Sequence, residues 1–242
     1  MAQQRQQADY LLLLDTGDAL LGGGPLGEKT KGEAIVAGMN LMGYDAMALG
    51  PKELRLGADL LRQRMEEAEF AVLSANAVFT GTEDLVADPY VILDIGGHRV
   101  GIIGLTRSPG KKPLTDFQVL DPEPALTRTI AEVKPQADTI ILLTNIGYRR
   151  SLTLADTIPG IDLVIAARPG QLPSMAVRTT ETGTLVVTAD QSMPRHSGRR
   201  VGRLVVTLEP DGSLSGETWA SVPMDKRIAD DPAMRDLLNG YR

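Results

Sequence analysis

Polar residues with metal- or anion-binding chemistry follow four strand-length apolar runs of the sequence. They fall at residues 15–18, 50–53, 144–147 and 166–170 and include Asp15, Asp18, Lys52, Glu53, Asn145 and Arg168. Ligands in open α/β folds bind where loops leave the carboxyl ends of the strands. We therefore expect these loops to converge on one site, where Lys52 and Arg168 could together bind a phosphate or carboxylate.

Each of these features also has a simpler structural interpretation. Residues 15–18 fit a turn in which Asp and Gly satisfy the backbone. Gly22-Gly23-Gly24-Pro25 fits a flexible loop, because it lacks the Lys and Ser/Thr that end a P-loop. Lys52 and Arg168 could instead form an internal salt bridge. Asn145 could be a polar loop residue or could bind a ligand, and the basic residues 195–203 fit a solvated loop that runs into an edge strand.

Strands and helices alternate around these loops. Helical spacing occurs at 31–42, 57–68, 122–133 and 151–157, and strand-length apolar runs occur at 10–14, 46–49, 70–73, 138–143 and 162–165. Two β runs, 90–94 and 98–105, flank Gly96-Gly97 and predict an antiparallel hairpin. The last third is β-rich. This order predicts an α/β fold, a four-layer α/β/β/α sandwich of two mixed sheets.

Length and composition favour one soluble globular unit. A chain of 242 residues can bury one sizeable core, and no linker marks a boundary, so we expect a single domain over residues 1–242. The net charge of −6 argues against nucleic acid as a partner. The lack of Cys excludes disulfides and thiolate metal sites. The apolar runs are too short to span a membrane, and the polar first residues show no signal peptide.

The strand-end segments resemble the 5′-nucleotidase and 2′,3′-cyclic phosphodiesterase branch of the calcineurin-like metallophosphoesterases. Residues 12–26 with Lys31-Gly32-Glu33 look like the family's LLDAGD segment and TKGE helix start, and residues 39–53 look like MNxMGYDAxxLGNHE. Further matching stretches are 74–76, 100–106, 144–148 where the family has SHLGY, and 159–170 where it has PGIDxIIGGHxH. The resemblance covers nearly the whole chain and implies the metallophosphoesterase fold.

The same resemblance implies a site with two divalent cations, held by carboxylates and neutral imidazoles, which polarise a phosphate and activate a water. Asp18 matches the bridging Asp of the family's GD motif and is the only ligand position that this sequence retains. In the NHE motif the ligand Asn is replaced by Pro51 and the catalytic His by Lys52, so that only Glu53 remains.

The other ligand positions also depart from the family pattern. Asn145 replaces the His of SHLG, and Arg168 and Gly170 replace both His residues of GHxH. The family's first strand, with its Asp-x-His ligands, has no counterpart ahead of Tyr10. The resemblance therefore implies a degenerate metal site.

The two histidines of the chain do not restore this site. His98 lies in the hairpin turn and His196 in a basic loop, and we expect both to be exposed loop imidazoles, since nothing nearby offers ligand spacing. A Lys or Arg at a ligand position places a fixed positive charge where a dication would sit. We hypothesise that Arg168 or Lys52 supplies the counter-charge of Asp18.

These replacements favour a family member that has lost metal binding and catalysis. Such a protein would act as a binding or structural module for a partner protein or a small anion, and no cofactor is expected. The alternative is an active phosphoesterase that hydrolyses nucleotide-like phosphate esters with an altered metal site around Asp15, Asp18, Glu53 and Asn145, completed in part by residues outside this chain.

The family's C-terminal nucleotide-specificity domain has no counterpart in this sequence. A truncated or fused relic of a longer enzyme is therefore a third interpretation. Many members of the family act outside the cytoplasm, so the resemblance favours an extracytoplasmic setting.

Overall fold

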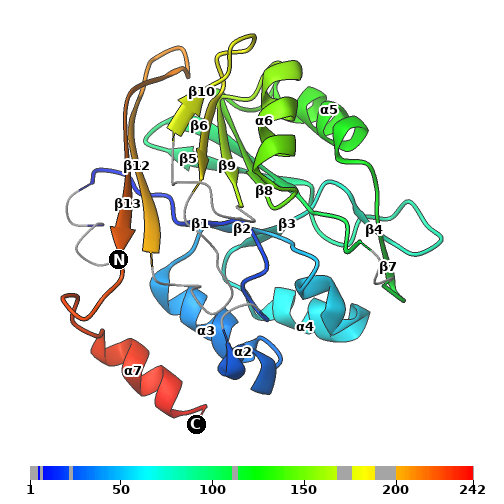
Figure 1. The fold of residues 1–242 in the computed structure, drawn as a ribbon, viewed down its shortest axis with the longest axis vertical. Helices are drawn as coiled ribbons and strands as arrows, with labels where there is room; N and C mark the ends of the chain where they lie inside the picture. Colours follow the sequence, from blue (N-terminus) through cyan, green and yellow to red (C-terminus); the bar gives the residue numbers. More distant parts are fainter. Residues whose placement is uncertain are drawn as a thin grey trace.

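The computed structural model describes residues 5, 8–21, 24–110, 114–167, 176–188 and 200–241. Two larger sheets form its centre, and Figure 1 shows the smaller one between the larger sheet and a group of helices. The smaller sheet is parallel between its described strands and has the order β1 (Leu14–Asp15), β2 (Ala46–Ala48) and β3 (Ala71–Leu73).

The larger sheet has six strands, with parallel pairing at its centre and antiparallel pairing at both edges. In spatial order they are β10 (Ala176–Arg178), β11 (Leu185–Thr188), β9 (Leu163–Ala166), β8 (Thr139–Thr144), β6 (His98–Leu105) and β5 (Tyr90–Ile95). The predicted hairpin is confirmed, because Ile95 pairs with His98 across Gly96-Gly97. Both glycines have positive φ, 64° and 89°, as a two-residue hairpin turn requires.

The alternation of side chains along β8 explains how the sheets are covered. All six residues of β8 are buried, and successive side chains of a strand point to opposite faces. Ile141 and Leu143 pack in the core between the two sheets, whereas Ile140 and Leu142 pack under the helices on the outer face. An apolar strand of this kind is typical of a sheet that is buried on both faces.

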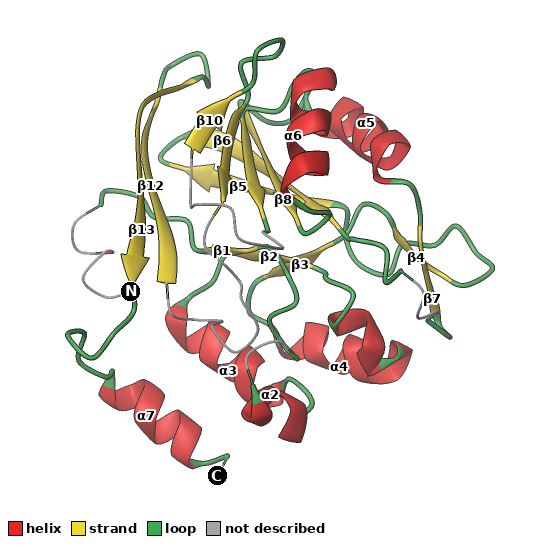
Figure 2. Cartoon of the chain, in the orientation of Figure 1, coloured by secondary structure: helices red, strands yellow, loops and turns green. Residues whose placement is uncertain are grey.

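Helices cover the outer faces of both sheets (Figure 2). On the six-stranded sheet lie α5 (Pro122–Val133) and α6 (Tyr148–Thr157), and on the three-stranded sheet lie α2 (Pro25–Lys29), α3 (Glu33–Met42) and α4 (Ala58–Glu67). Helix α5 begins where the Asp121 side chain accepts the Glu123 N–H, and α3 ends at Gly43 with φ of 69°. The four-layer α/β/β/α prediction is therefore confirmed.

Two smaller ribbons, a short helical turn and a last helix complete the described chain. They are β4 (Ala77–Phe79) with β7 (Phe117–Val119), β12 (Arg200–Leu208) with β13 (Leu214–Pro223), the 3-10 turn η1 (Glu53–Leu56) and α7 (Pro232–Asn239). The long β12–β13 ribbon packs Leu204 and Trp219 against the core between the sheets. None of the helices in the described ranges has the length and apolar character needed to cross a membrane.

Candidate functional site at the strand ends

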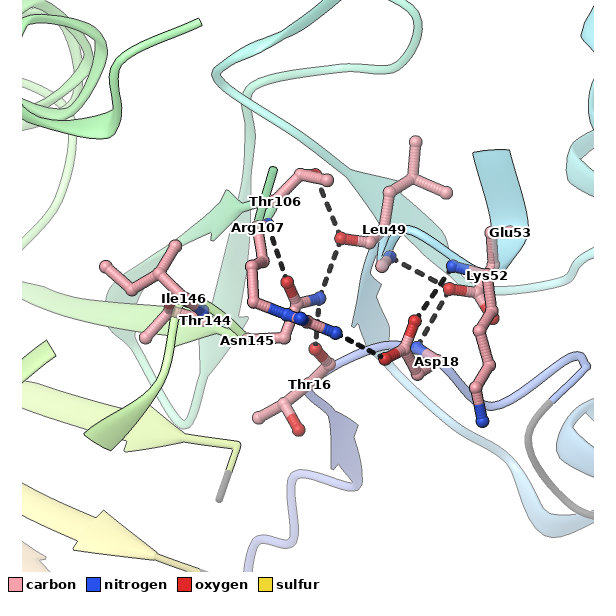
Figure 3. A network of polar contacts seen from close by, with 11 residues as sticks. Thr16, Asp18, Leu49, Lys52, Glu53, Thr106, Arg107, Thr144, Asn145 and Ile146 are labelled. Carbon is pink, nitrogen blue, oxygen red and sulfur yellow. Dashed lines mark hydrogen bonds and ion pairs between the residues drawn. The ribbon is translucent and has the colours of Figure 1, made fainter. Parts of the chain in front are cut away.

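The loops after β1, β2, β6 and β8 meet where these strands end (Figure 3). Asn145, after β8, donates its side-chain amide to the main-chain carbonyls of Thr16, after β1, and Leu49, after β2, at 2.9 Å each. Three of the four loops predicted from the sequence thus come together. The fourth contains Arg168 and Gly170, which lie outside the described residues.

Two glycines allow these loops to approach one another closely. A Cβ atom on Gly17 would lie 2.5 Å from the carbonyl oxygen of Ala48 and 2.7 Å from Nδ2 of Asn145. A Cβ atom on Gly50 would overlap Oδ1 of Asp18 and lie 2.5 Å from its backbone nitrogen. Since real side chains do not approach this closely, the site depends on glycine at both positions.

Asp18 is held by the protein on both oxygens of its carboxylate. Its Oδ1 accepts the backbone N–H of Lys52 at 2.9 Å, and its Oδ2 lies 3.6 Å from the guanidinium of Arg107. Its own N–H donates to Glu53 at 2.8 Å, and its φ of 64° is unusual for a residue with a side chain. The surrounding loops therefore fix both the backbone and the side chain of Asp18.

Asp15 ends β1 and accepts the N–H of Gly17 on its own Oδ1 at 2.7 Å. This local bond is the turn that residues 15–18 predict. Burial raises the pKa of Asp15 to about 6, partly offset by the Gly17 N–H and reinforced by the nearby Asp18 carboxylate.

Glu53 is fully buried and collects three backbone N–H donors. Its Oε2 accepts from Asp18 and Gly50 at 2.8 Å each, and its Oε1 accepts from Leu20 at 2.9 Å. Burial, and then the Asp18 carboxylate, raise the pKa of Glu53 to about 7, while the three N–H donors lower it. Glu53 thus ties the loop after β1 to the loop after β2.

Asn145 is buried, with 4% of its surface exposed. Besides its two donated bonds, its Oδ1 accepts the backbone N–H of Arg107 at 2.7 Å. Its side chain is therefore neither a solvated loop group nor one turned toward an open site. It joins the loops around it.

Lys52 contacts Asp18 through its backbone, not through its ammonium group. Among the described residues the ammonium forms no ion pair, and Figure 3 shows it extending on the side of Asp18 away from Arg107. Of the two cations expected beside Asp18, Lys52 thus contributes an N–H donor, and Arg168 is not described. The cation that the structure places against Asp18 is Arg107.

Arg107 is the site residue that the sequence analysis missed. The stretch that matches the family ends at Thr106, and Arg107 is the next residue, the second after the end of β6 at Leu105. Because β6 pairs in parallel with β8, the loops after these strands leave the same edge of the sheet. The strand end was therefore the signal that could have identified it.

Within the part of the chain that the structure describes, the side chains of the site do not form the carboxylate and imidazole ligand set that the family resemblance implies. Within the described ranges, no three His, Cys, Asp or Glu side chains come together as a metal-binding group. The oxygens of Asp18 and Glu53 are already engaged by N–H groups and by Arg107. His98 is not an exposed turn residue as expected, since it is partly buried at the start of β6. His196 lies outside the described residues.

Curated proteins similar to this chain are phosphoesterases. No family model matches the chain. It is 28% identical to the trifunctional nucleotide phosphoesterase YfkN of Bacillus subtilis over 98% of its length, which is 19% of that protein. It is also 28% identical to the 5′-nucleotidase of Bos taurus over 99% of its length, which is 45% of that protein. The chain therefore spans less than half the length of these relatives.

Solved structures agree with this similarity. A 5′-nucleotidase precursor from Thermus thermophilus superposes on 99% of the chain with a TM-score of 0.81 and 26% identity, over half of its own length. The calcineurin-like phosphoesterase YfkN of Bacillus subtilis shares the fold, with a TM-score of 0.79. These relationships contradict the expectation that this chain uses no cofactor, because its homologues in the 5′-nucleotidase and calcineurin-like family depend on divalent metals. The homologues of this chain are thus 5′-nucleotidases and the calcineurin-like phosphoesterase YfkN, and its structural neighbours are members of the 5′-nucleotidase family.

Proposed function

We propose that this 5′-nucleotidase-like phosphoesterase domain has lost hydrolysis at its strand-end site and acts as a binding or structural module for a small anion or a partner protein. One observation carries the proposal. The side-chain polar atoms of Glu53 and Asn145, and Oδ1 of Asp18, are hydrogen-bonded to loops of the protein itself, and Oδ2 of Asp18 lies 3.6 Å from the Arg107 guanidinium. Groups engaged in this way hold the loops together and are not free to act on a substrate.

The chemistry of the replaced residues supports the same proposal. Phosphate ester hydrolysis of this class uses metal-bound water as the nucleophile and an imidazole for proton transfer or ligation. Lys52 stands where the family resemblance implies the catalytic His, and a protonated ammonium group has no lone pair with which to accept a proton or bind a metal. Pro51 has no side-chain oxygen to replace the ligand Asn.

The relatives favour one alternative, in which the domain still hydrolyses phosphate esters. Their printed names are those of nucleotide phosphoesterases and 5′-nucleotidases, and the carboxylates of Asp15, Asp18 and Glu53 remain near one another in the site. In that case residues beyond this chain would complete the metal site. One relative is a snake venom 5′-nucleotidase, which supports an extracytoplasmic setting.

Hydrolysis and metal content, measured on the same preparation, test the proposal. The purified chain is dialysed against Mn²⁺ or Zn²⁺, its metal content is measured by mass spectrometry, and release of phosphate from AMP and p-nitrophenyl phosphate is followed. We expect no turnover above that of the Asp18→Ala variant. The control is Thr153→Ala, an exposed change on α6. The proposal would be overturned if the wild type and Thr153→Ala both released phosphate and Asp18→Ala did not.

A reversion adds a second measurement. Pro51→Asn, Lys52→His and Asn145→His together restore the family's residue types at three of the replaced positions. If the replacements are what removed catalysis, this variant should gain metal-dependent phosphate release relative to the wild type. A wild type as active as the reverted protein contradicts this explanation.

A further inference from the structure

The guanidinium group of Arg107 is fixed at its base and open at its end. Its backbone N–H is held by the buried Asn145 side chain at 2.7 Å, and its side chain is 47% exposed. Its one charged neighbour among the described residues is Oδ2 of Asp18, at 3.6 Å. This distance is longer than the roughly 2.8 Å of a charge-assisted hydrogen bond.

Asp18 therefore does not form the two parallel hydrogen bonds that the guanidinium group of Arg107 can donate. Within the described part of the chain its guanidinium donates no hydrogen bond, so its paired N–H groups are available to a second oxyanion. A guanidinium fork matches the spacing of phosphate or carboxylate oxygens, which it binds through two parallel hydrogen bonds.

Hydrogen bonds and close packing hold Asp18 in place beside Arg107. Its Oδ1 is held by the Lys52 N–H at 2.9 Å, and its own N–H is held by Glu53 at 2.8 Å. Gly50 packs against it so closely that no larger residue fits. Asp18 is therefore a fixed charge beside Arg107, whereas the half-exposed Arg107 side chain can move.

Lys52 adds a second positive charge on the other side of Asp18. Its side chain is partly buried, and its ammonium group forms no ion pair within the described ranges. Figure 3 shows the two cationic side chains extending on either side of the Asp18 carboxylate. Arg107 and Lys52 together outweigh the single charge of Asp18, while the site also holds the buried carboxyl groups of Asp15 and Glu53, whose pKa values burial raises to about 6 and about 7.

We propose that Arg107 is the anion-binding residue of this site, that it binds a phosphate group through its guanidinium fork, and that Asp18 is an internal competitor for it. Lys52 assists by its charge alone. The inference rests on the proposed function, because it names the ligand class of the binding module. The inference predicts that Asp18 weakens phosphate binding, whereas Asp18 would strengthen phosphate binding if it held a metal ion.

Binding of two probes to five proteins tests this inference. Inorganic phosphate and AMP are titrated calorimetrically, at low ionic strength and after EDTA treatment, into the wild type and the Arg107→Ala, Arg107→Lys, Asp18→Asn and Arg62→Ala variants. Arg62 is the matched control, because it is an exposed arginine that pairs with Asp59 on α4. Circular dichroism and thermal unfolding establish that each variant is folded.

Arg107→Ala should weaken phosphate binding about tenfold or more, the effect of losing a charge-assisted pair. Arg107→Lys should retain part of the affinity, since a point charge replaces the fork. Asp18→Asn should bind about fivefold more tightly, because a partly exposed competing charge is removed. Arg62→Ala should bind as the wild type does. Tighter binding of AMP than of phosphate would assign a nucleotide as the ligand, and equal affinities would assign free phosphate.

Three results would overturn the inference: no phosphate or AMP binding by the wild type, wild-type affinity in Arg107→Ala, or weaker binding in Asp18→Asn. The two proposals fail separately. If the chain shows metal-dependent hydrolysis that requires Asp18, the proposed loss of catalysis is wrong. The titrations still test whether Arg107 binds the anion. Binding that does not depend on Arg107 removes only the present inference.

Discussion

Oδ1 of Asn145 accepts the backbone N–H of Arg107 at 2.7 Å, and this bond joins the ends of two neighbouring parallel strands, β8 and β6. The amide nitrogen of the same side chain donates to the carbonyls of Thr16 and Leu49, which directly follow β1 and β2 of the other sheet. One buried side chain thus links the carboxyl ends of both central sheets. Hydrogen bonds of Asn145 thus hold together the loops after β1, β2, β6 and β8.

Asn145→Ala should therefore destabilise the whole domain. It removes three hydrogen bonds and leaves the Arg107 N–H and the Thr16 carbonyl without this partner. Because a buried polar group left unsatisfied costs about 1–3 kcal/mol, we expect a loss of about 3 kcal/mol in the free energy of unfolding. Urea titration followed by circular dichroism measures it. Thr153→Ala, on the exposed face of α6, should change stability by less than about 0.5 kcal/mol. A loss below that of the control would show that Asn145 does not join the loops.

Gly50→Ala should separate the loop of Asp18 from β2. The added methyl group would overlap Oδ1 of Asp18 and meet Oε2 of Glu53 at 2.8 Å. Overpacking of this kind costs about 1–3 kcal/mol. Gly38→Ala is the matched change, since its methyl group would meet the Met234 side chain at an ordinary 3.7 Å and alanine is favoured inside α3 by about 1 kcal/mol. Thermal unfolding should show a lower midpoint for Gly50→Ala only. Equal midpoints would contradict the close packing of Gly50 against Asp18 and Glu53.

The sequence predicts the layers of this fold well, because the long elements carry strong patterns. Residues 122–133 were expected to be helical and form α5 with the same bounds. The runs at 90–94 and 98–105 form the antiparallel pair β5 and β6. Three residues are too few to show a period, so β2 and β3 were predicted only as the apolar runs 46–49 and 70–73, and β4 and β7 were not predicted. Helix α6 begins at Tyr148, three residues before the expected start, since no side chain caps it to mark its beginning.

The sequence predicted where the site lies better than it predicted which atoms make its contacts. The strand-end rule located residues 15–18, 50–53 and 144–147, which the structure brings together. The rule does not reveal which polar group of a residue is used. Lys52 contributes its backbone N–H, and Asn145 is buried with its side chain turned to main-chain groups. Those outcomes depend on loop geometry, which the types and spacing of residues do not specify.

Glu53→Gln should loosen the loop of Asp18 without removing the side chain. The amide retains one acceptor oxygen, so it cannot accept from Leu20 on one side and from both Asp18 and Gly50 on the other. At least one N–H loses its partner, at a cost of about 2 kcal/mol. Amide hydrogen exchange at Asp18, Leu20 and Gly50 should accelerate, while Glu28→Gln, an exposed change on α2, should leave it unchanged. Wild-type exchange rates in Glu53→Gln would exclude this bracing role.

Arg178 and Glu217 should make the attachment of the β12–β13 ribbon depend on pH. Arg178, on β10, donates from Nε to Oε1 of Glu217 at 2.7 Å and from Nη2 to Oε2 at 3.0 Å, and these bonds lower the pKa of Glu217 from its usual 4.5 to about 2. A carboxyl group whose pKa is lower in the folded state stabilises the fold above its unfolded pKa. That contribution is lost as the pH falls from about 4.5 toward about 2.

We therefore expect the wild type to be more stable than Glu217→Gln at pH 7. This difference in the free energy of unfolding should shrink between pH 5 and pH 3, because protonation removes the charge that the variant already lacks. Urea midpoints at each pH measure it. Glu181→Gln, an exposed change in the turn between β10 and β11, is the matched control. The pair is partly exposed, so the effect should also weaken as salt is added. A difference that grows toward acid pH would mean that Glu217 is not held as a carboxylate by Arg178.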